Sequence, residues 1–430
     1  MKEFWQKLPG YRRAAVLELY LVYFVLGVAV ILIGSVLPQL REANGLSYGQ
    51  SGNLLSVQSV GFLLVGLVTG AAVLKLGIHR AYVITVAFLP IGMFMLVKGG
   101  FFLFLAAAMF LVGISKGAIT DYNNRVMSDY AEGEASPLNS LHIFFAIGAC
   151  LAPFFALFLT GVSEERGWLY AMIVSAALAV AAVIAGIFVK MDLSADKGAG
   201  KAETGDTAGA GGSAEGAGTA GAVKGTEAAG AAAAASAVAD TSLDFFREPL
   251  FIWTLIIGIC DQALESSLMG WMTTYYLETG IVSEQVSQLT TSLLWFAFLV
   301  GRIICMLIAM KWHPEKMLLI MGSGTAVFMI LLTISMNASL LFISTIGLGL
   351  CLSGVYGTAV SNASSVFTHY SSAMGLYVTI AGIGGAAAPA AIGWISDLSS
   401  VRIGFCVLVV MAAILTFAVV MNMMLVRKKR

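Results

Sequence analysis

Twelve long apolar stretches recur along this chain of 430 residues and constrain its fold more than any other feature. A helix needs roughly 20 apolar residues to cross about 30 Å of hydrocarbon. The sequence therefore predicts an all-α polytopic membrane protein with twelve transmembrane helices. The expected spans lie near 16–38, 50–74, 81–98, 100–124, 138–160, 167–189, 249–277, 285–310, 316–335, 339–367, 372–395 and 401–426.

The composition excludes several other classes of protein. Apolar residues make up 59% of the chain and charged residues 11%, whereas a water-soluble domain is about 45–50% apolar and about 25% charged. The formal net charge is zero, so nucleic acid is not expected as a partner. The five cysteines fit neither a disulfide framework nor a zinc site. Without a Walker A or catalytic motif, we expect no ATP, metal or other cofactor and no enzymatic activity.

The distribution of Lys and Arg predicts the orientation in the membrane. One set of loops and tails carries most of them, including the closing Arg427–Arg430, while the opposite loops carry only Arg41, Lys98, Arg166 and Arg402. Because cytoplasmic loops are enriched in Lys and Arg, both termini are expected in the cytoplasm. A multi-pass protein of the plasma membrane, surrounded by lipid, is the expected setting.

The stretch 191–243 divides the two sets of spans. It consists mainly of Gly, Ala, Ser and Thr with a few charges, and it has too few bulky apolar residues to offset the entropy of ordering. We therefore expect an N-terminal six-helix bundle at 1–190, a flexible cytoplasmic linker at 191–243, and a C-terminal six-helix bundle at 244–430.

The two predicted bundles resemble each other in sequence. Gly148–Pro153 in the fifth span resembles Gly384–Pro389 in the eleventh, 236 positions later, and Gly34 and Gly270 differ by the same 236. Two parallel repeats of six spans are the layout of the major facilitator superfamily, in which the solute site lies between the halves near the midplane.

The chain also resembles this superfamily in short motifs. The loop 70–80, with Lys75 and Arg80, is similar to its glycine-rich and basic signature, although Leu74 stands where an Asp is usual. Within the superfamily, the stretches 113–124, 138–148 and 265–271 most resemble sugar–proton symporters of the fucose transporter group. The resemblance implies a secondary transporter that works as a monomer.

Carboxylates in the seventh span are the leading candidates for proton coupling. Asp261 and Glu265 lie about 18 Å and about 24 Å along a helix that starts near residue 249, and their i, i+4 spacing places them on one face. A charge at mid-bilayer costs roughly 2.5–3.5 kcal/mol, so it is expected only beside a cavity or a partner. Two such neighbours cannot both ionise easily, so one is expected to hold a proton.

The fourth span adds a second charged group. Lys116, Thr120 and Asn123 are predicted to share one face of the helix, and Asp121 and Arg125 share another with Asn124 between them. The resemblance to sugar symporters implies a coupling carboxylate in this span, for which Asp121 is the candidate. A local ion pair with Arg125 would instead assign Asp121 to a gate. Lys116 is expected to neutralise a carboxylate or to bind an anionic group of the solute.

Uncharged polar residues complete the predicted solute site. Sugars are bound by several hydrogen bonds and an aromatic face. The candidates in the spans are Asn123, Asn124, Asn139, His142, Gln58, Gln262, Asn362 and Trp271. Structural contacts are the alternative for His142 and Asn362, and an interfacial anchor is the alternative for Trp271. Lys75, Arg80 and Arg125 are assigned to gating.

The function expected from these features is secondary active transport, with proton-coupled uptake of a monosaccharide or related polyhydroxy solute. Sodium coupling, a small organic anion as cargo and a transport-inactive membrane receptor are the alternatives. Buried charges speak against the receptor, because a scaffold has no reason to bear their insertion cost.

Overall fold

The computed structural model describes residues 2–131, 135–163, 165–193, 243–309, 311–370 and 372–429. Most of these residues are helical. The elements are α1 (Lys2–Lys7), α2 (Gly10–Ser35), α3 (Leu37–Ala43), α4 (Tyr48–Leu76), α5 (Ile78–Val86), α6 (Phe88–Lys98), α7 (Phe102–Ala131), α8 (Ala135–Val162), α9 (Gly167–Phe188), η4 (Asp244–Arg247), α11 (Pro249–Thr279), α12 (Glu284–Ala309), α13 (Pro314–Ile334), α14 (Ala338–Leu352), α15 (Val355–Asn362), α16 (Ser364–His369), α17 (Ala373–Leu398), α18 (Val401–Gly404) and α19 (Cys406–Lys429).

The predicted spans are found as helices. Eleven helical segments of the described chain are long and apolar enough to cross a membrane, and α4, bent by 50° after Val65, makes twelve if it is one broken span. Three spans are interrupted helices: α5 with α6, α14 with α15, and α18 with α19. The all-α fold with twelve transmembrane helices is confirmed.

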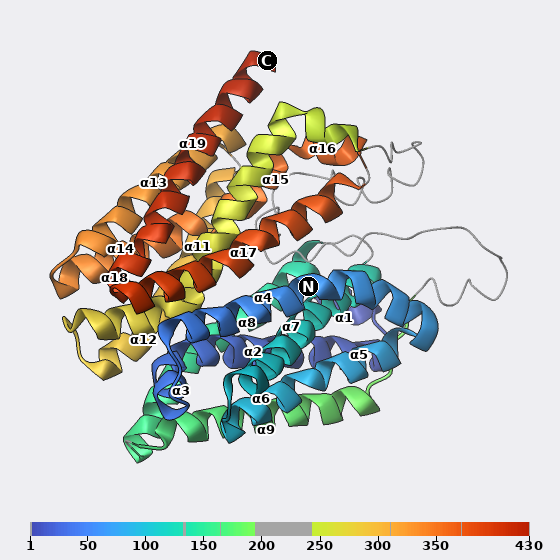
Figure 1. The fold of residues 1–430 in the computed structure, drawn as a ribbon. Helices are drawn as coiled ribbons and strands as arrows, with labels where there is room; N and C mark the ends of the chain where they lie inside the picture. The colour runs from blue at the N-terminus through green and yellow to red at the C-terminus, as the bar shows by residue number, and fades with distance from the viewer. Residues whose placement is uncertain are drawn as a thin grey trace.

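The helices form two bundles (Figure 1). The lower bundle in that view contains α2 to α9 and the upper one contains α11 to α19. The bundles contact each other mainly through α4 with α17, α8 with α12, and α2 with α11. Of the predicted linker, only 191–193 and 243 are among the described residues; 194–242 lie outside them.

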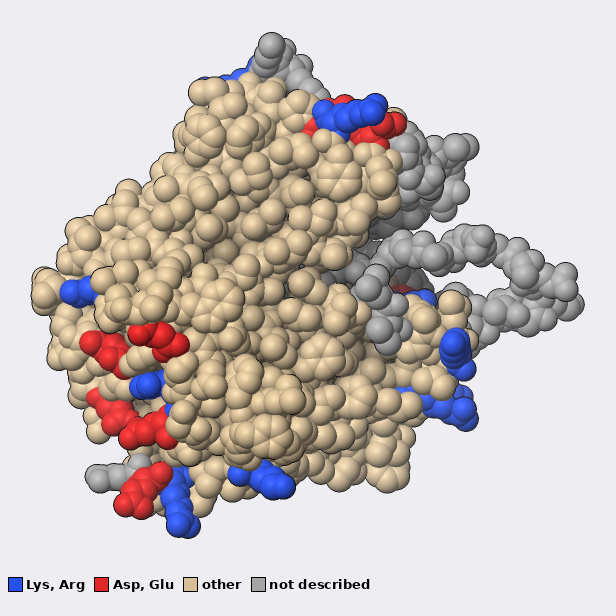
Figure 2. Space-filling view, viewed as in Figure 1, with Lys and Arg blue, Asp and Glu red and all other residues tan. Residues whose placement is uncertain are grey.

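The surface of the molecule fits a bilayer. Figure 2 shows a broad band without charged residues, and its Asp, Glu, Lys and Arg gather at the two ends. Large apolar side chains are exposed in the membrane-spanning helices, among them Phe158 at 70%, Phe188 at 83% and Phe417 at 58%. Such a surface is stable only against lipid, so we describe the chain as spanning a membrane.

Repeated glycines set the spacing of equivalent helix pairs in the two bundles. A Cβ atom on Gly148 of α8 would lie 2.1 Å from the carbonyl oxygen of Phe24 in α2. Its repeat partner, Gly384 of α17, would place a Cβ atom 2.0 Å from the carbonyl oxygen of Ile259 in α11. Small residues allow such close helix packing in membranes. The glycine pair that indicated the repeat therefore has the same structural role in both halves.

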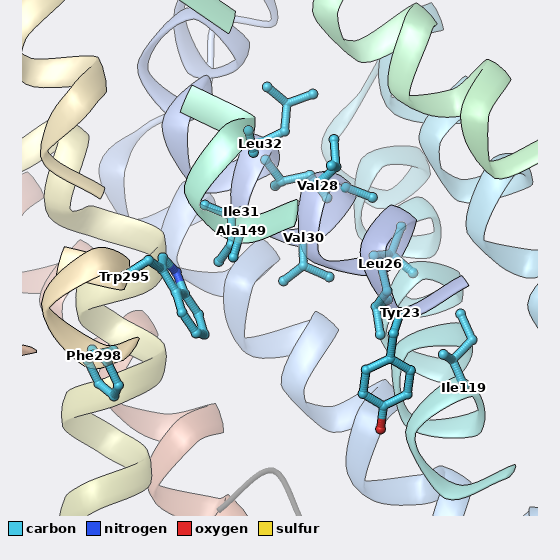
Figure 3. Packing of buried hydrophobic residues seen from close by; sticks show 14 of the residues in the cluster. Tyr23, Leu26, Val28, Val30, Ile31, Leu32, Ile119, Ala149, Trp295 and Phe298 are labelled. Carbon is cyan, nitrogen blue, oxygen red and sulfur yellow. The ribbon is translucent and has the colours of Figure 1, made fainter. Parts of the chain in front are cut away.

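The buried core extends across the contact between the bundles. Trp295 and Phe298 project from α12, with Trp295 directed toward Ile31 of α2 and Ala149 of α8 (Figure 3). The ring of Trp295 lies edge-on to Phe145, with centroids 5.4 Å apart. These apolar contacts join the halves beside the polar groups described below.

The two ends of the 191–243 segment are each held by their own bundle. Asp192 accepts a hydrogen bond from Tyr130 at 3.3 Å and one from Tyr11 at 3.2 Å, and it pairs with Arg12 at 3.3 Å. On the other side, Phe245 of η4 is fully buried and packs against Phe251. We call these two attachments the Asp192 clasp and the Phe245 plug.

Candidate functional site

One end of the interface between the bundles is closed by hydrogen bonds. Asp397, at the end of α17, accepts bonds from the hydroxyl of Ser47 at 2.8 Å, from the backbone N–H of Tyr48 at 2.8 Å and from that of Gly49 at 2.9 Å. Ser47 already caps α4, so a carboxylate of one half completes the helix N-terminus of the other. Carboxylates are favourable at this position because it carries partial positive charge.

Further polar contacts surround this latch, which we define as Ser47, Tyr48, Gly49 and Asp397. The hydroxyl of Tyr48 donates to Glu278 of α11, and Arg41 pairs with the same carboxylate at 3.8 Å. Trp271, predicted as a solute-binding aromatic residue, is fully buried and donates its indole N–H to the carbonyl of Pro389 at 3.2 Å. The centroid of its ring lies 6.4 Å from that of Tyr48, a member of the latch.

The predicted carboxylate pair lies in the interior on α11. Asp261 is 1% exposed and its Oδ1 atom has no hydrogen-bond partner among the described residues. Glu265, one helical turn further, is half-buried, and its charge acts on Asp261. Gln262, between them, is also half-buried. A buried carboxyl oxygen without a hydrogen-bond donor costs free energy. This arrangement therefore favours the binding of a proton or of a polar ligand.

A cation that the sequence analysis missed lies within electrostatic reach of Asp261. Arg302, half-buried on α12, acts electrostatically on Asp261 and on His142 of α8. Its charge therefore acts on a carboxylate of the C-terminal half and on a histidine of the N-terminal half. The hydroxyl of Tyr377 in α17 also lies within the electrostatic reach of Asp261 and has no hydrogen-bond partner among the described residues.

The N-terminal half contributes a polar line opposite Arg302. His142 lies edge-on to Tyr23 of α2, with ring centroids 5.7 Å apart. The hydroxyl of Tyr23 donates to Asn124 of α7 at 3.4 Å, and the amide nitrogen of Asn124 has no partner among the described residues. We call the set His142, Asn124, Asp261, Glu265 and Arg302 the central polar layer.

The charged residues of the fourth span lie apart from one another. Lys116 is half-buried and its ammonium group lies 5.0 Å from the ring centroid of Phe62 in α4. Asp121 is within hydrogen-bonding reach of the Thr69 hydroxyl. Arg125 is exposed and acts on Asp121 electrostatically, but no ion pair within 4.0 Å joins them among the described residues. The local pair that would have assigned Asp121 to a gate is therefore not formed.

Two predicted solute-binding amides form hydrogen bonds within their own half. Asn123 is fully buried and donates to the carbonyl of Leu19 in α2 at 3.0 Å. Asn362 donates to Asn422 of α19, which in turn donates to the Thr254 hydroxyl at 3.0 Å. Asn362 is thus tied to α19, whereas the buried Oδ1 atom of Asn123 has no hydrogen-bond partner among the described residues.

Three other predicted residues lie away from this layer or outside the described residues. Lys75 and Arg80 are exposed on either side of the turn at Gly77, which joins α4 to α5. The side chain of Asn139, in the first turns of α8, lies outside the described part of the structure.

A second missed charge is Glu18 of α2. It is 3% exposed and its Oε1 atom accepts a hydrogen bond from the Tyr82 hydroxyl at 3.3 Å. Glu18 and Arg302 share a simple sequence signal, since each is a single charge inside a predicted span, and such charges mark functional positions by default. A systematic listing of them would have found both.

Comparison with known proteins identifies the family. The model of the Major Facilitator Superfamily matches residues 19–363 and 254–430. The chain belongs to this superfamily. Among curated relatives of this facilitator, the glucose/mannose transporter GlcP of Bacillus subtilis (strain 168) is 23% identical over 401 residues, which cover 92% of this chain and 91% of GlcP.

Solved structures of other facilitators have the same fold. A D-xylose–proton symporter superposes with a TM-score of 0.73 at 12% identity, covering 96% of this chain and 97% of the symporter. The fucose–proton symporter FucP of E. coli gives 0.58 at 13%, covering 96% and 99%. The nucleoside transporter NupG gives 0.69 at 12%, covering 95% and 99%. The predicted resemblance to sugar symporters is confirmed at the level of family and fold.

Proposed function

We propose that this facilitator is a secondary active transporter that couples the uptake of a monosaccharide or related polyhydroxy solute to protons. The observation that carries the proposal is the buried Asp261, which has an unpartnered carboxyl oxygen, Glu265 one turn away and Arg302 facing it. It acts as a monomer in the plasma membrane, with both termini in the cytoplasm. The sugar and sugar–proton transporters among its relatives support the cargo class.

Glu265 is the leading proton carrier in this proposal. It is half-buried, so water can reach it. Its negative charge and that of Asp261 repel each other in a region of low dielectric. Protonation of either carboxyl group relieves this repulsion and leaves the other to pair with Arg302. Asp261, or Asp121 on α7, serves as the relay.

The solute is held by the polar groups around that pair. His142, Asn124 and Gln262 offer the donors and acceptors that hydroxyl groups require, and Lys116 adds a further donor from α7. The unpartnered amide nitrogen of Asn124 is a hydrogen-bond donor that a sugar hydroxyl can satisfy. The unpartnered Oδ1 atom of Asn123 keeps that residue as a candidate acceptor, whereas Asn362 and Trp271 remain in the proposal only as residues that shape the walls.

Alternating access follows from the position of the latch. The bundles are joined by hydrogen bonds at the Asp397 end and diverge toward the end that carries α5 and α16 (Figure 1). With both termini in the cytoplasm, the latch is extracellular, and it closes the interface on that side in the described conformation. Uptake requires the latch to open, solute and proton to bind in the central polar layer, and the halves to rock.

The test is external pH in lightly buffered, de-energised cells that express the protein. We expect alkalinisation when one compound from a panel of sugars, polyols, nucleosides and sugar acids is added, and no signal from a Glu265→Gln variant. Glu165→Gln, which removes an exposed carboxylate outside the site, is the matched control and should behave as the parent. A response that requires sodium, or one that survives in Glu265→Gln, would refute proton coupling through Glu265.

A small organic anion is the second candidate cargo, and Arg302 is the observation that favours it. A guanidinium group binds a carboxylate in a bidentate manner, and Lys116 supplies a second cation. In the same assay, a response to acids but not to neutral sugars, lost in Arg302→Gln, would establish this alternative. Absence of transport for every compound, together with retained binding, would indicate a receptor.

A further inference from the structure

A surface pocket of about 500 Å³ lies where α12 ends and α13 begins. Its walls are Lys311, Trp312, His313, Lys316, Leu319 and Ile320. The pocket is at the end of two membrane-spanning helices and contains none of the residues of the central polar layer. It is therefore separate from the proposed solute site.

The polar wall of this pocket is basic and available to a ligand. Lys311, His313 and Lys316 are all exposed, and neither lysine forms an ion pair with another described residue. The neighbouring carboxylate, Glu315, is only 4% exposed; it interacts within the protein, and its Oε2 atom has no hydrogen-bond partner among the described residues. An anion that enters the pocket therefore meets two exposed ammonium groups that form no ion pair with a described residue.

The opposite wall is apolar and continues into the membrane-facing surface. Trp312 is 47% exposed and Ile320, two turns further along α13, is 54% exposed. Tryptophan is enriched at the boundary between headgroups and hydrocarbon because its ring is amphipathic. A ligand that fits both walls has an anionic head at Lys311 and Lys316 and an acyl chain along Trp312 and Ile320.

The internal repeat relates this pocket to the loop 70–80 of the N-terminal half, but the two differ at the position of Trp312. The shift of 236 relates Lys75 to Lys311 and Arg80 to Lys316, so the two cations occur in both halves. The residue between them that corresponds to Trp312 is Leu76, which is 43% exposed. The C-terminal half thus adds an interfacial aromatic side chain to the shared pair of cations.

We propose that this pocket binds the phosphate headgroup of an anionic phospholipid from the leaflet that adjoins it. Lys311 and Lys316 contact the phosphate, and Trp312 with Ile320 lies along the upper acyl chain. Basic pockets at the ends of transmembrane helices bind such headgroups through charge and proximity to the surface. The inference is independent of the transported solute.

The experiment uses the purified full-length protein, stripped of lipid in detergent, and counts bound phosphatidylglycerol by native mass spectrometry as its concentration is raised. The Lys311→Gln/Lys316→Gln variant is expected to bind one phosphatidylglycerol about 30-fold more weakly, since each cation near an anionic surface contributes ~1 kcal/mol. Trp312→Ala should weaken the binding of phosphatidylglycerol and leave the binding of inorganic phosphate unchanged. Phosphatidylcholine should not distinguish the variants.

The matched control is Lys190→Gln/Arg427→Gln, which removes two exposed cations that lie outside the pocket and form no ion pair with a described residue. It should bind phosphatidylglycerol as the parent does. Equal binding by the parent and the Lys311/Lys316 variant would overturn the proposal, as would an equal loss in the control. Displacement of the lipid by low-millimolar inorganic phosphate, with no effect of Trp312→Ala, would identify a free-phosphate site instead.

Discussion

The latch and the central polar layer join the same two bundles by different means. At the latch, Asp397 accepts three hydrogen bonds, so donors and acceptor satisfy one another. In the central layer, Arg302 acts on Asp261 and His142 through its charge, while Asp261 and Asn124 retain polar atoms without partners. The hydrogen bonds of the first contact are therefore satisfied in this conformation, whereas the second contains unsatisfied polar atoms that, in our proposal, a proton or a solute would satisfy.

The largest effect is expected from Asp261→Asn in the central layer. The amide keeps the size of the side chain but cannot exchange a proton. A gradient of one pH unit is worth about 1.4 kcal/mol per proton, or about a factor of ten in the solute ratio. Under that gradient, accumulation in proteoliposomes should fall about tenfold, to equilibration. Exchange of labelled for unlabelled solute should continue, and its loss would show that Asp261 binds solute instead.

A smaller effect is expected from Asp397→Ala in the latch. Loss of a helix-capping acceptor costs about 1 kcal/mol, which shifts the balance between closed and open latch about fivefold. Leu55, 6% exposed on α4, reports this shift because it lies at the contact with Gly270 of α11. In a cysteine-free background, Leu55→Cys should react about fivefold faster with an impermeant maleimide when Asp397 is replaced.

Ser399→Ala is the control for that measurement. Ser399 lies two residues from Asp397, but among the described residues its hydroxyl donates only to the carbonyl of Ile395. Unchanged labelling in Asp397→Ala would mean that the apolar packing around Trp295, and not the latch, keeps this end closed.

The smallest effect on transport is expected from the buried amides. Asn422→Ala leaves the amide of Asn362 without its acceptor, which should cost about 1–3 kcal/mol of stability. Thermal unfolding should occur at lower temperature while the KM for the solute is unchanged. Asn362→Ala should have the same effects. The loss of stability in the double variant should be smaller than the sum of the two single losses, because the two residues share one hydrogen bond. A raised KM in Asn362→Ala alone would return this residue to the solute site.

The fold was accessible from the sequence because its signals are local. Each span is a long apolar run with few charged residues, and the repeat is visible in glycines such as Gly148 and Gly384 that set helix spacing. The pairing of Asp261 with Glu265 was equally accessible, since i, i+4 neighbours on a helix share a face. These inferences need no knowledge of how distant segments pack.

The contacts between segments could not be read in the same way. Asp397 and Ser47 are 350 residues apart, and nothing in either neighbourhood indicates the other. Asn123 was placed on one face with Lys116, yet it bonds to a carbonyl of α2, because a helix inside a bundle has neighbours on several sides. Arg302 was overlooked as one charge within an apolar run, although that is the signal by which Asp261 was found.

The Asp192 clasp and the Phe245 plug have a consequence for how the polypeptide can be assembled. Each bundle fastens its own end of the intervening segment through Tyr130 and Arg12 on one side and Phe251 on the other. Neither end therefore depends for its position on a continuous backbone between residues 193 and 243. Two separately translated chains, one ending and one beginning within that interval, should still find each other in the membrane and form a working carrier.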